Sequence, residues 1–198
     1  MQNDVITHYN RLVEENKDPV HDPFPLQRYM DLWDGDEFLQ DLDLSPDKSV
    51  LEIGIGTGRL AIKVCGLCKE LTGIDISDKT VQRAQENLKE YHNLHLICAD
   101  FMQYPFQETF NVIYSSLTFM HIQAKEEAVK KVASLLSPSG RFILSIEKSQ
   151  NNQIVYGEHV IPTYPDNPNN IKHYLENAHL KIIKQYETEF AIIFVALK

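Results

Sequence analysis

The sequence predicts an α/β protein built on a mostly parallel sheet that closes with an antiparallel hairpin. From residue 49 onward, short apolar runs with strand character alternate with segments of helical periodicity. Such alternation indicates a parallel sheet with helices on both faces, which makes three layers. The last two apolar runs are separated only by Glu187, Thr188 and Glu189, and so short a link allows only an antiparallel pair.

We expect seven strands in this sheet. The runs predicted to be strands are rich in Val, Ile, Leu and Phe and are bounded by Gly, Pro, Ser or Asp. We expect residues 137–140, Ser-Pro-Ser-Gly, to form a turn before the fifth strand. The predicted strands cover residues 49–53, 70–76, 94–99, 110–115, 141–146, 180–186 and 190–197.

The helices of this core are predicted from apolar residues that recur at three- and four-residue spacing. Ser77 is placed to cap the second of them, because a serine side chain can accept a hydrogen bond from the first turn. The core helices are expected over residues 59–65, from Ser77 to about 88, over 123–136 and over 170–178.

Two regions lie outside this alternation. Residues 1–48 contain two expected helices, 4–15 and 25–42, which we interpret as an N-terminal helical cap on a core of residues 49–198. Residues 147–169 are polar and rich in Pro and Asn, and we expect a loop that serves as a lid or substrate segment. The whole chain is expected to form a single domain.

Composition excludes several classes of function. The formal net charge of −9 argues against binding nucleic acid, whose affinity comes from neutralised phosphates. The N-terminus lacks the apolar stretch of a signal peptide, and the longest apolar run is far shorter than a bilayer span. We therefore expect a cytoplasmic protein that does not bind membranes. The three cysteines predict neither a disulfide framework nor a metal site.

The segment Val-Leu-Glu-Ile-Gly-Ile-Gly-Thr-Gly, residues 50–58, predicts a ligand site. Gly54, Gly56 and Gly58 follow a strand and precede a helix, the setting in which a glycine turn approaches a nucleotide-like ligand. The nicotinamide fingerprint would need its third glycine one residue later. Glu52 stands in the strand itself, where it disfavours a pyrophosphate and can orient the turn by accepting its N–H groups.

Other polar residues follow the ends of the predicted strands. Asp75, Asp100, Ser115 and Glu147 each stand at or just after such an end. Because parallel sheets bind ligands at the carboxyl ends of their strands, we expect these residues to converge on the glycine turn.

Together these motifs resemble the class I S-adenosylmethionine-dependent methyltransferases. The resemblance covers about residues 47–198 and includes the acid and three glycines of residues 52–58, the Asp75 that closes the second strand, and the pair Asp100-Phe101. It implies a Rossmann-like fold and S-adenosylmethionine as cofactor, with S-adenosylhomocysteine as product and no metal. The residues that it implies for cofactor binding are Glu52, Gly54, Ile55, Gly56, Gly58, Asp75, Ile76, Asp100, Phe101, Ser115 and Ser116.

Specific roles follow from this resemblance. Asp75 would accept both ribose hydroxyls, Ile76 would pack on the adenine, and Asp100 would accept from the adenine amino group. The backbone N–H of Phe101 would serve a ring nitrogen, while Ser115 or Ser116 would line the methionine part.

The acceptor site is predicted from residues near the cap, the fourth strand and the lid. A protonated oxygen or nitrogen acceptor needs a base. His121 is our candidate, with a packing role as its alternative. Aromatic faces can stabilise a sulfonium. The further candidates are Tyr9, Trp33, Tyr114, Phe119, Glu147, His159 and Tyr164.

The predicted function is methyl transfer to a small-molecule oxygen or nitrogen acceptor by in-line displacement. The motif Asn/Asp-Pro-Pro-Tyr of amino methylation on bases and glutamine does not occur. Two alternatives stay open: an NAD(P)-dependent oxidoreductase on the same fold, and a non-catalytic regulatory protein that binds S-adenosylmethionine. The sequence leaves the acceptor and the oligomeric state undefined.

Overall fold

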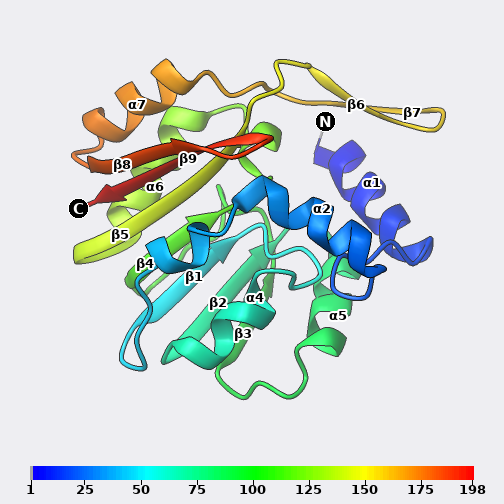
Figure 1. The fold of residues 1–198 in the computed structure, drawn as a ribbon, viewed down its shortest axis with the longest axis horizontal. Helices are drawn as coiled ribbons and strands as arrows, with labels where there is room; N and C mark the ends of the chain where they lie inside the picture. Colours follow the sequence, from blue (N-terminus) through cyan, green and yellow to red (C-terminus); the bar gives the residue numbers. More distant parts are fainter. Residues whose placement is uncertain (1) are drawn as a thin grey trace.

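A seven-stranded sheet forms the centre of the computed structural model, which describes residues 2–198 (Figure 1). Its strand order is β3-β2-β1-β4-β5-β9-β8. The first five strands run parallel, and β9 is antiparallel to both β5 and β8. The predicted fold class, with its C-terminal antiparallel hairpin, is confirmed. The strands are β1 Ser49–Ile53, β2 Glu70–Asp75, β3 Leu94–Cys98, β4 Phe110–Ser115, β5 Leu136–Glu147, β8 Lys181–Glu187 and β9 Ala191–Leu197.

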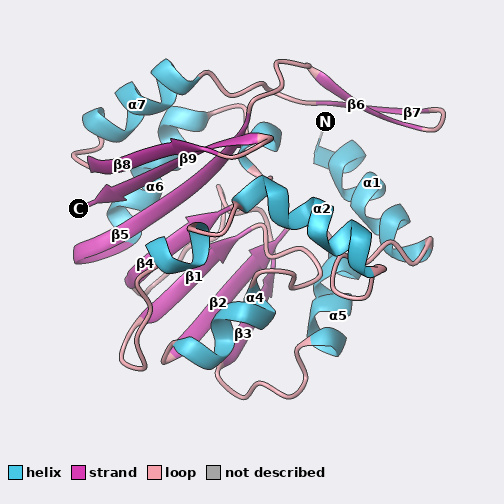
Figure 2. Ribbon diagram, viewed as in Figure 1, coloured by secondary structure: helices cyan, strands magenta, loops and turns pink. Residues whose placement is uncertain are grey.

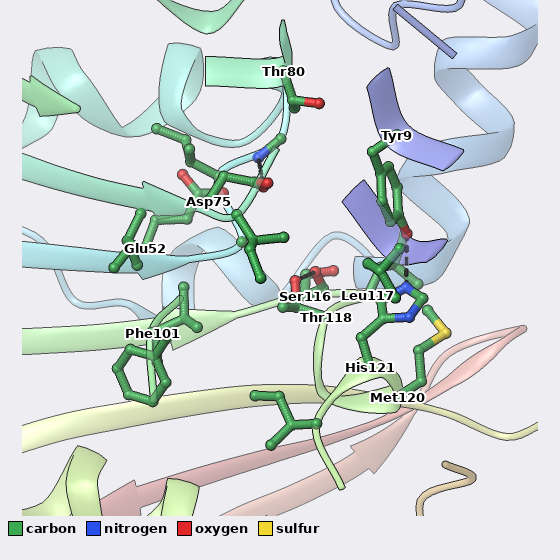
Figure 3. Close-up of a pocket in the computed structure, with 18 of the residues that line it drawn as sticks. Tyr9, Glu52, Asp75, Thr80, Phe101, Ser116, Leu117, Thr118, Met120 and His121 are labelled. Atoms are coloured by element: carbon green, nitrogen blue, oxygen red, sulfur yellow. Dashed lines mark hydrogen bonds between the residues drawn. The ribbon is translucent and has the colours of Figure 1, made fainter. Parts of the chain in front are cut away.

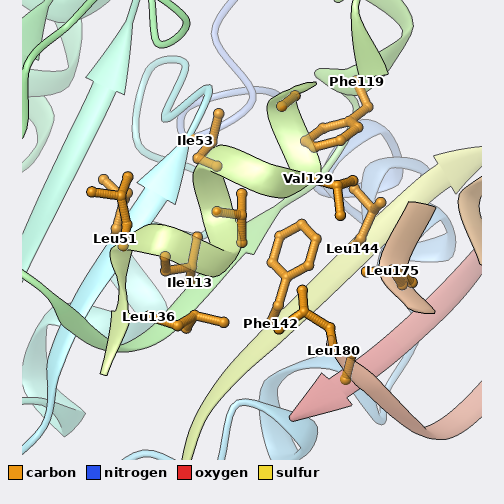
Figure 4. Packing of buried hydrophobic residues seen from close by; sticks show 14 of the residues in the cluster. Leu51, Ile53, Ile113, Phe119, Val129, Leu136, Phe142, Leu144, Leu175 and Leu180 are labelled. Carbon is orange, nitrogen blue, oxygen red and sulfur yellow. The ribbon is translucent and has the colours of Figure 1, made fainter. Parts of the chain in front are cut away.

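Helices lie on both faces of this sheet (Figure 2), and a hydrophobic core fills the space on each face. On one face, α6 (Lys125–Leu135) and α7 (Pro168–Asn177) pack on side chains such as Phe142 and Leu144 (Figure 4). On the other face, α3 (Phe38–Asp41), α4 (Ala61–Val64) and α5 (Asp78–Asn87) cover the alternate strand residues. Strand β1 shows the alternation, because Leu51 belongs to the first core and Val50 to the second.

Local signals set the ends of several helices as predicted. The Ser77 side chain accepts a hydrogen bond from the Thr80 backbone N–H at 3.2 Å and caps α5. Helix α7 ends at Asn177, and His179 takes a positive φ of 58° just beyond it. The first core helix is shorter than predicted, because α4 passes into the 3-10 turn η1 (Cys65–Leu67).

The second N-terminal helix is interrupted. Instead of one helix over residues 25–42, the structure has α2 (Phe24–Asp34) and α3, with Gly35 between them. Gly35 has a φ of 76°, which a helix cannot continue through, and its N–H bonds to the carbonyl of Asp31. The break directs α2 over the carboxyl ends of the strands and leaves α3 to pack on the sheet (Figure 1).

The predicted turn at residues 137–140 is part of a strand. Strand β5 begins at Leu136, and its register with β4 shifts between the pairs Phe110–Leu136 and Val112–Arg141. Ser139 has a φ of 62°, so the segment forms a strand irregularity in which Ser139 takes a left-handed conformation. The Pro and Gly therefore marked a bulge in the strand where we expected a turn before it.

The segment expected to be a polar loop contains a second, two-stranded sheet. Strands β6 (Gln153–Tyr156) and β7 (His159–Pro162) pair antiparallel around Gly157, whose φ is 60°. This hairpin lies beside α1 (Gln2–Glu14) in Figure 1. Within residues 2–198, no helix is long and apolar enough to cross a membrane.

Candidate functional site

One cavity of about 880 Å³ opens at the carboxyl ends of the parallel strands. The glycine turn after β1, the segments that follow β2, β3 and β4, and the end of β5 form its floor. Residues of α1, α2 and the β6–β7 region close it from above. The volume falls within the range of small-molecule sites. Figure 3 shows its two ends, with Asp75, Glu52 and Phe101 at one and Tyr9 and His121 at the other.

The glycine turn is held by backbone bonds to β2. The N–H groups of Gly54 and Ile55 both donate to the carbonyl of Ile74, at 2.8 and 3.1 Å. A Cβ on Gly54 would lie 2.0 Å from Thr118 Oγ1, and one on Gly58 would lie 2.8 Å from Leu88 Cδ1. Those two glycines therefore allow close packing, and Gly58 does not line the cavity.

Gly56 is different. It has a φ of 57°, it lines the cavity, and a Cβ placed on it would meet nothing within 4 Å. Its backbone thus faces open space, as expected where a ligand lies against a glycine turn. This open face fits the cofactor that the sequence implies.

Asp75 connects the turn to the next helix. One of its carboxylate oxygens accepts from the Gly56 N–H and the other from the Ser77 N–H, both at 3.0 Å. Burial raises the pKa of Asp75, while these backbone donors oppose the shift. Each oxygen retains a lone pair, and the residue lines the cavity, so the carboxylate can accept from a ligand diol.

Glu52 does not orient the glycine turn as we predicted. The turn's N–H groups are bonded to Ile74, Ile55 and Asp75, whereas Glu52 Oε2 accepts from the Tyr114 hydroxyl at 2.7 Å. The reason is register, since Glu52 and Tyr114 are paired residues on the adjacent strands β1 and β4. Burial raises the pKa of Glu52 to about 8. Tyr114 is fully buried beneath Glu52 and does not line the cavity.

The other cofactor candidates fall at the same end of the cavity. Ile76, Asp100 and Phe101 all line it, and Asp100 Oδ1 accepts from the Met102 N–H at 2.8 Å. Phe101 is buried, and Lys131 Nζ lies 5.2 Å from its ring centroid. These residues therefore form a partly apolar end that suits a planar heterocycle.

The two serines after β4 have separate surroundings. Ser115 is fully buried, donates to the Ile53 carbonyl at 2.9 Å and does not line the cavity. Ser116 lines it, and its hydroxyl donates to Asp34 of α2.

Sequence reasoning missed Asp34 and its partner Arg59. The guanidinium of Arg59 lies 2.6 Å from Asp34 Oδ2, and both side chains are largely buried. This ion pair joins α2 to the residue after the glycine turn. Arg59 at the position after Gly58 was a visible signal, whereas nothing near Asp34 in the sequence marked it.

Tyr9 and His121 meet at the opposite end. Tyr9 Oη and His121 Nε2 lie 2.8 Å apart and are hydrogen-bonded (Figure 3). Burial lowers the pKa of His121 to about 4, so the imidazole is neutral near pH 7. Burial also raises the pKa of Tyr9. Within the described chain, His121 Nδ1 is buried without a hydrogen-bond partner.

The remaining acceptor-site candidates divide into two groups. Trp33, Glu147 and Tyr164 line the cavity. Phe119 and His159 do not. Phe119 is buried in the core with its ring 6.2 Å from that of Phe142 (Figure 4), and His159 is exposed on β7. A 3-10 turn, η2 (Phe119–His121), explains this split, because it turns Phe119 into the core and His121 toward the cavity.

Comparison with known proteins matches this chain to methyltransferases. Residues 50–140 match the family model described as a methyltransferase domain. The chain is 34% identical over 125 residues to an uncharacterized methyltransferase of Anoxybacillus flavithermus. That match covers 60% of this chain and 57% of the relative, so the chain spans little more than half of the relative's length.

Two solved structures share the fold. Magnesium protoporphyrin IX methyltransferase (ChlM) from Synechocystis PCC 6803, with bound SAM, matches with a TM-score of 0.77 at 19% identity, covering 100% of this chain and 96% of that one. The N-methyltransferase NodS from Bradyrhizobium japonicum WM9 matches with a TM-score of 0.67 at 18% identity, covering 90% and 98%. At these identities the matches show a common fold. Among residues 2–198, no group of three or more His, Cys, Asp or Glu could hold a metal.

Proposed function

Because this chain belongs to the class I S-adenosylmethionine-dependent methyltransferase family, we propose that it transfers a methyl group from S-adenosylmethionine to a small-molecule oxygen or nitrogen acceptor. The observation that carries this proposal is the single cavity that joins the glycine turn and Asp75 to Tyr9 and His121. A donor and an acceptor can therefore lie in the same enclosed space.

The residues at the floor of the cavity would hold the cofactor. Asp75 would accept from its ribose, Gly56 would lie against it, and Ile76, Asp100 and Phe101 would enclose the adenine. Ser116, beside Thr118, would face the methionine part. When bound, S-adenosylmethionine supplies a methyl group activated by the positive sulfur. Glu52, buried under the turn with a pKa raised to about 8, is largely protonated near pH 7, and the positive sulfur of a bound donor would favour its carboxylate form.

The chain's contribution at the other end is orientation and exclusion of water. Well-oriented intramolecular reactions gain roughly 7–11 kcal/mol from positioning alone. His121 is neutral near pH 7 and would accept a hydrogen bond from the acceptor group, and the proton itself where that group is a hydroxyl. Tyr9 orients the imidazole. Residues 1–48, as the cap, and residues 147–169, as the lid, would cover the acceptor.

A calorimetric titration tests the donor. We expect S-adenosylhomocysteine to bind and NAD⁺ and NADP⁺ not to bind. Asp75→Ala should weaken binding at least tenfold, because a charged hydrogen bond is worth about 1.5–3 kcal/mol. Asp36→Ala, which changes an exposed carboxylate on the α2–α3 link, is the matched control and should bind normally. Thermal melting of both variants separates lost contacts from lost folding.

The same experiment distinguishes the two alternatives. Binding of the dinucleotide without the homocysteine derivative would make the protein an oxidoreductase. Binding of S-adenosylhomocysteine, with no product formed from any of a broad set of hydroxyl, amine, thiol and carboxylate acceptors, would make it a non-catalytic regulator. The net charge of −9 supports our choice of a small molecule over nucleic acid, and we expect the reaction to occur in the cytoplasm.

A further inference from the structure

The acceptor end of the cavity is mostly apolar. Beyond the cofactor residues, it is lined by aliphatic and methionine side chains from α1, α2, η2 and the β6–β7 hairpin, with Tyr9, His121 and Tyr164 as polar groups. The apolar residues include Val5, Leu12, Val13, Met30, Met120 and Ile154. This lining fits an acceptor with an apolar body.

Most charges that border this end are balanced. Arg59 is paired with Asp34 at 2.6 Å. Lys17, which is exposed, and Asp22, which is partly buried, stand on the α1–α2 connection and have opposite signs. Glu147, at the end of β5, is different: its side chain lines the cavity outside these ion pairs, and its electrostatic neighbours are Tyr9 and Asp166, neither of which is basic.

The basic partner of Asp166 is Lys125. Lys125 lies 2.8 Å from Asp166 Oδ1 and donates to the Phe119 carbonyl at 2.7 Å. Asp166 is buried, with 1% of its side chain exposed. This corner therefore holds two carboxylates and one ammonium, and burial together with Asp166 raises the pKa of Glu147. A cation from a ligand would complete the charge balance.

We propose that the methyl acceptor is a primary or secondary amine on an apolar body, and that Glu147 binds its ammonium form beside Tyr9 and His121. This inference rests on the proposed methyl transfer and narrows it to one class of acceptor. The same charge that attracts an ammonium repels a carboxylate or phosphate acceptor. A hydroxyl acceptor would have to lose its proton to His121, which is a weak base with a pKa of about 4.

Methyl transfer to an amine needs no strong base, because the ammonium has to lose only one proton before it reacts. The bound ammonium gives one proton to the Glu147 carboxylate, which leaves a neutral amine. The amine lone pair forms the new N–C bond to the methyl carbon while the C–S bond breaks and its electron pair stays on sulfur. The methylated product carries the positive charge that the sulfur loses, and protonated Glu147 returns its proton to solvent. His121 accepts a hydrogen bond that directs the nitrogen.

Matched ligands test this proposal on the full chain. The probes are primary amines on benzyl, phenylethyl, indolylethyl and hexyl bodies, each with the alcohol and the carboxylate of the same body. We would measure their binding to the S-adenosylhomocysteine complex by calorimetry, and product formation with S-adenosylmethionine. We expect at least one body to show the amine binding and reacting at least tenfold better than its alcohol and its carboxylate.

Substitutions at Glu147 test whether this residue causes the preference for amines. Glu147→Gln should weaken amine binding and turnover about tenfold to hundredfold, the range for losing a charged partner, and leave alcohols unchanged. Its affinity for S-adenosylhomocysteine should equal that of the wild type. Glu147→Asp should restore part of the loss. Glu176→Gln, an exposed change on α7, is the matched control.

The outcomes separate the two proposals. A protein that does not bind S-adenosylhomocysteine contradicts the proposed function itself. A protein that binds it, yet prefers alcohols or carboxylates, or binds none of the amines better than their alcohols, contradicts only the amine inference. Equal amine binding by Glu147→Gln and wild type would overturn the role of Glu147.

Discussion

The two ends of the cavity are built in different ways. The donor end consists of strand ends and the turns that follow them, joined by backbone bonds such as Gly54 N–H to Ile74 and by Asp75 between two N–H groups. The acceptor end brings together α1, η2, the end of β5 and a surface hairpin, through single side-chain contacts such as Tyr9 to His121. The comparison teaches that the sheet itself builds the proposed donor site, whereas the proposed acceptor site depends on segments that are distant in the chain.

The largest expected effect is at the donor end. Gly54→Ala places a methyl group against Thr118 at a positive φ, and the combined strain and overpacking should cost about 2–5 kcal/mol. We expect S-adenosylhomocysteine binding to fall at least thirtyfold, measured by calorimetry, and the melting temperature to drop. Gly157→Ala in the β6–β7 turn, where a Cβ has open space, is the control and should cost only about 1–2 kcal/mol of stability. Normal binding of S-adenosylhomocysteine by Gly54→Ala would contradict the view that close backbone packing defines the donor end.

A second test uses the low pKa of His121. The unfolded chain protonates this histidine near its ordinary pKa of 6.5, whereas the folded chain does so only near 4. Between these values the unfolded state binds more protons, so the free energy of unfolding should fall as the pH drops from about 6.5 to 4. The part due to His121 should reach up to about 3 kcal/mol.

Denaturation with urea at several pH values measures this contribution. His121→Asn should lose less stability across the window than the wild type, while His92→Asn, at an exposed site, should follow the wild type. If the free energy of unfolding changed with pH in the same way for His121→Asn and the wild type, the acceptor end would be open to water. The contrast between the two ends of the cavity would then be smaller than we describe.

The smallest expected effect concerns the contact between the lid hairpin and α1. The Tyr156 hydroxyl donates to Glu15, and both side chains are solvent-exposed enough that Tyr156→Phe should change stability by less than about 0.5 kcal/mol. Urea denaturation checks this value, and acceptor KM checks whether the contact matters for binding. A loss well above this figure would show that the hairpin is fixed to the cap as firmly as the glycine turn is fixed to β2.

The residues themselves explain which predictions could be made from sequence. The positions of Gly56, Asp75 and Asp100 on the cavity could be predicted because each lies at or just after the end of a parallel strand, and those ends meet at one edge of the sheet. The Tyr9–His121 bond joins residues that are 112 positions apart, so no local pattern could reveal it. Glu52 was misinterpreted because its partner, Tyr114, depends on the register of β1 with β4.

Three further differences between the predicted and the observed structure have identifiable causes. Tyr156-Gly157-Glu158-His159, flanked on each side by β-branched residues, is a hairpin signal that the surrounding Pro and Asn residues obscured. Gly35 could have been read as a break between two helices. Phe119 and His121 could not be assigned to core and cavity, since that depends on the 3-10 geometry of η2 rather than on residue type.

The aspartates of the cap have a consequence for engineering. Asp18, on the connection between α1 and α2, accepts from Thr57 and Asn87 and pairs with Arg83. Asp34, at the end of α2, pairs with Arg59. These side chains thus connect the cap at two points to the glycine turn and to Arg59, the residue after it. A chimera that imports a cap from another enzyme to change the acceptor would have to import matching residues at 57, 59, 83 and 87 as well, because the graft would otherwise leave Arg59 and Arg83 without their carboxylates and Thr57 and Asn87 without their acceptor.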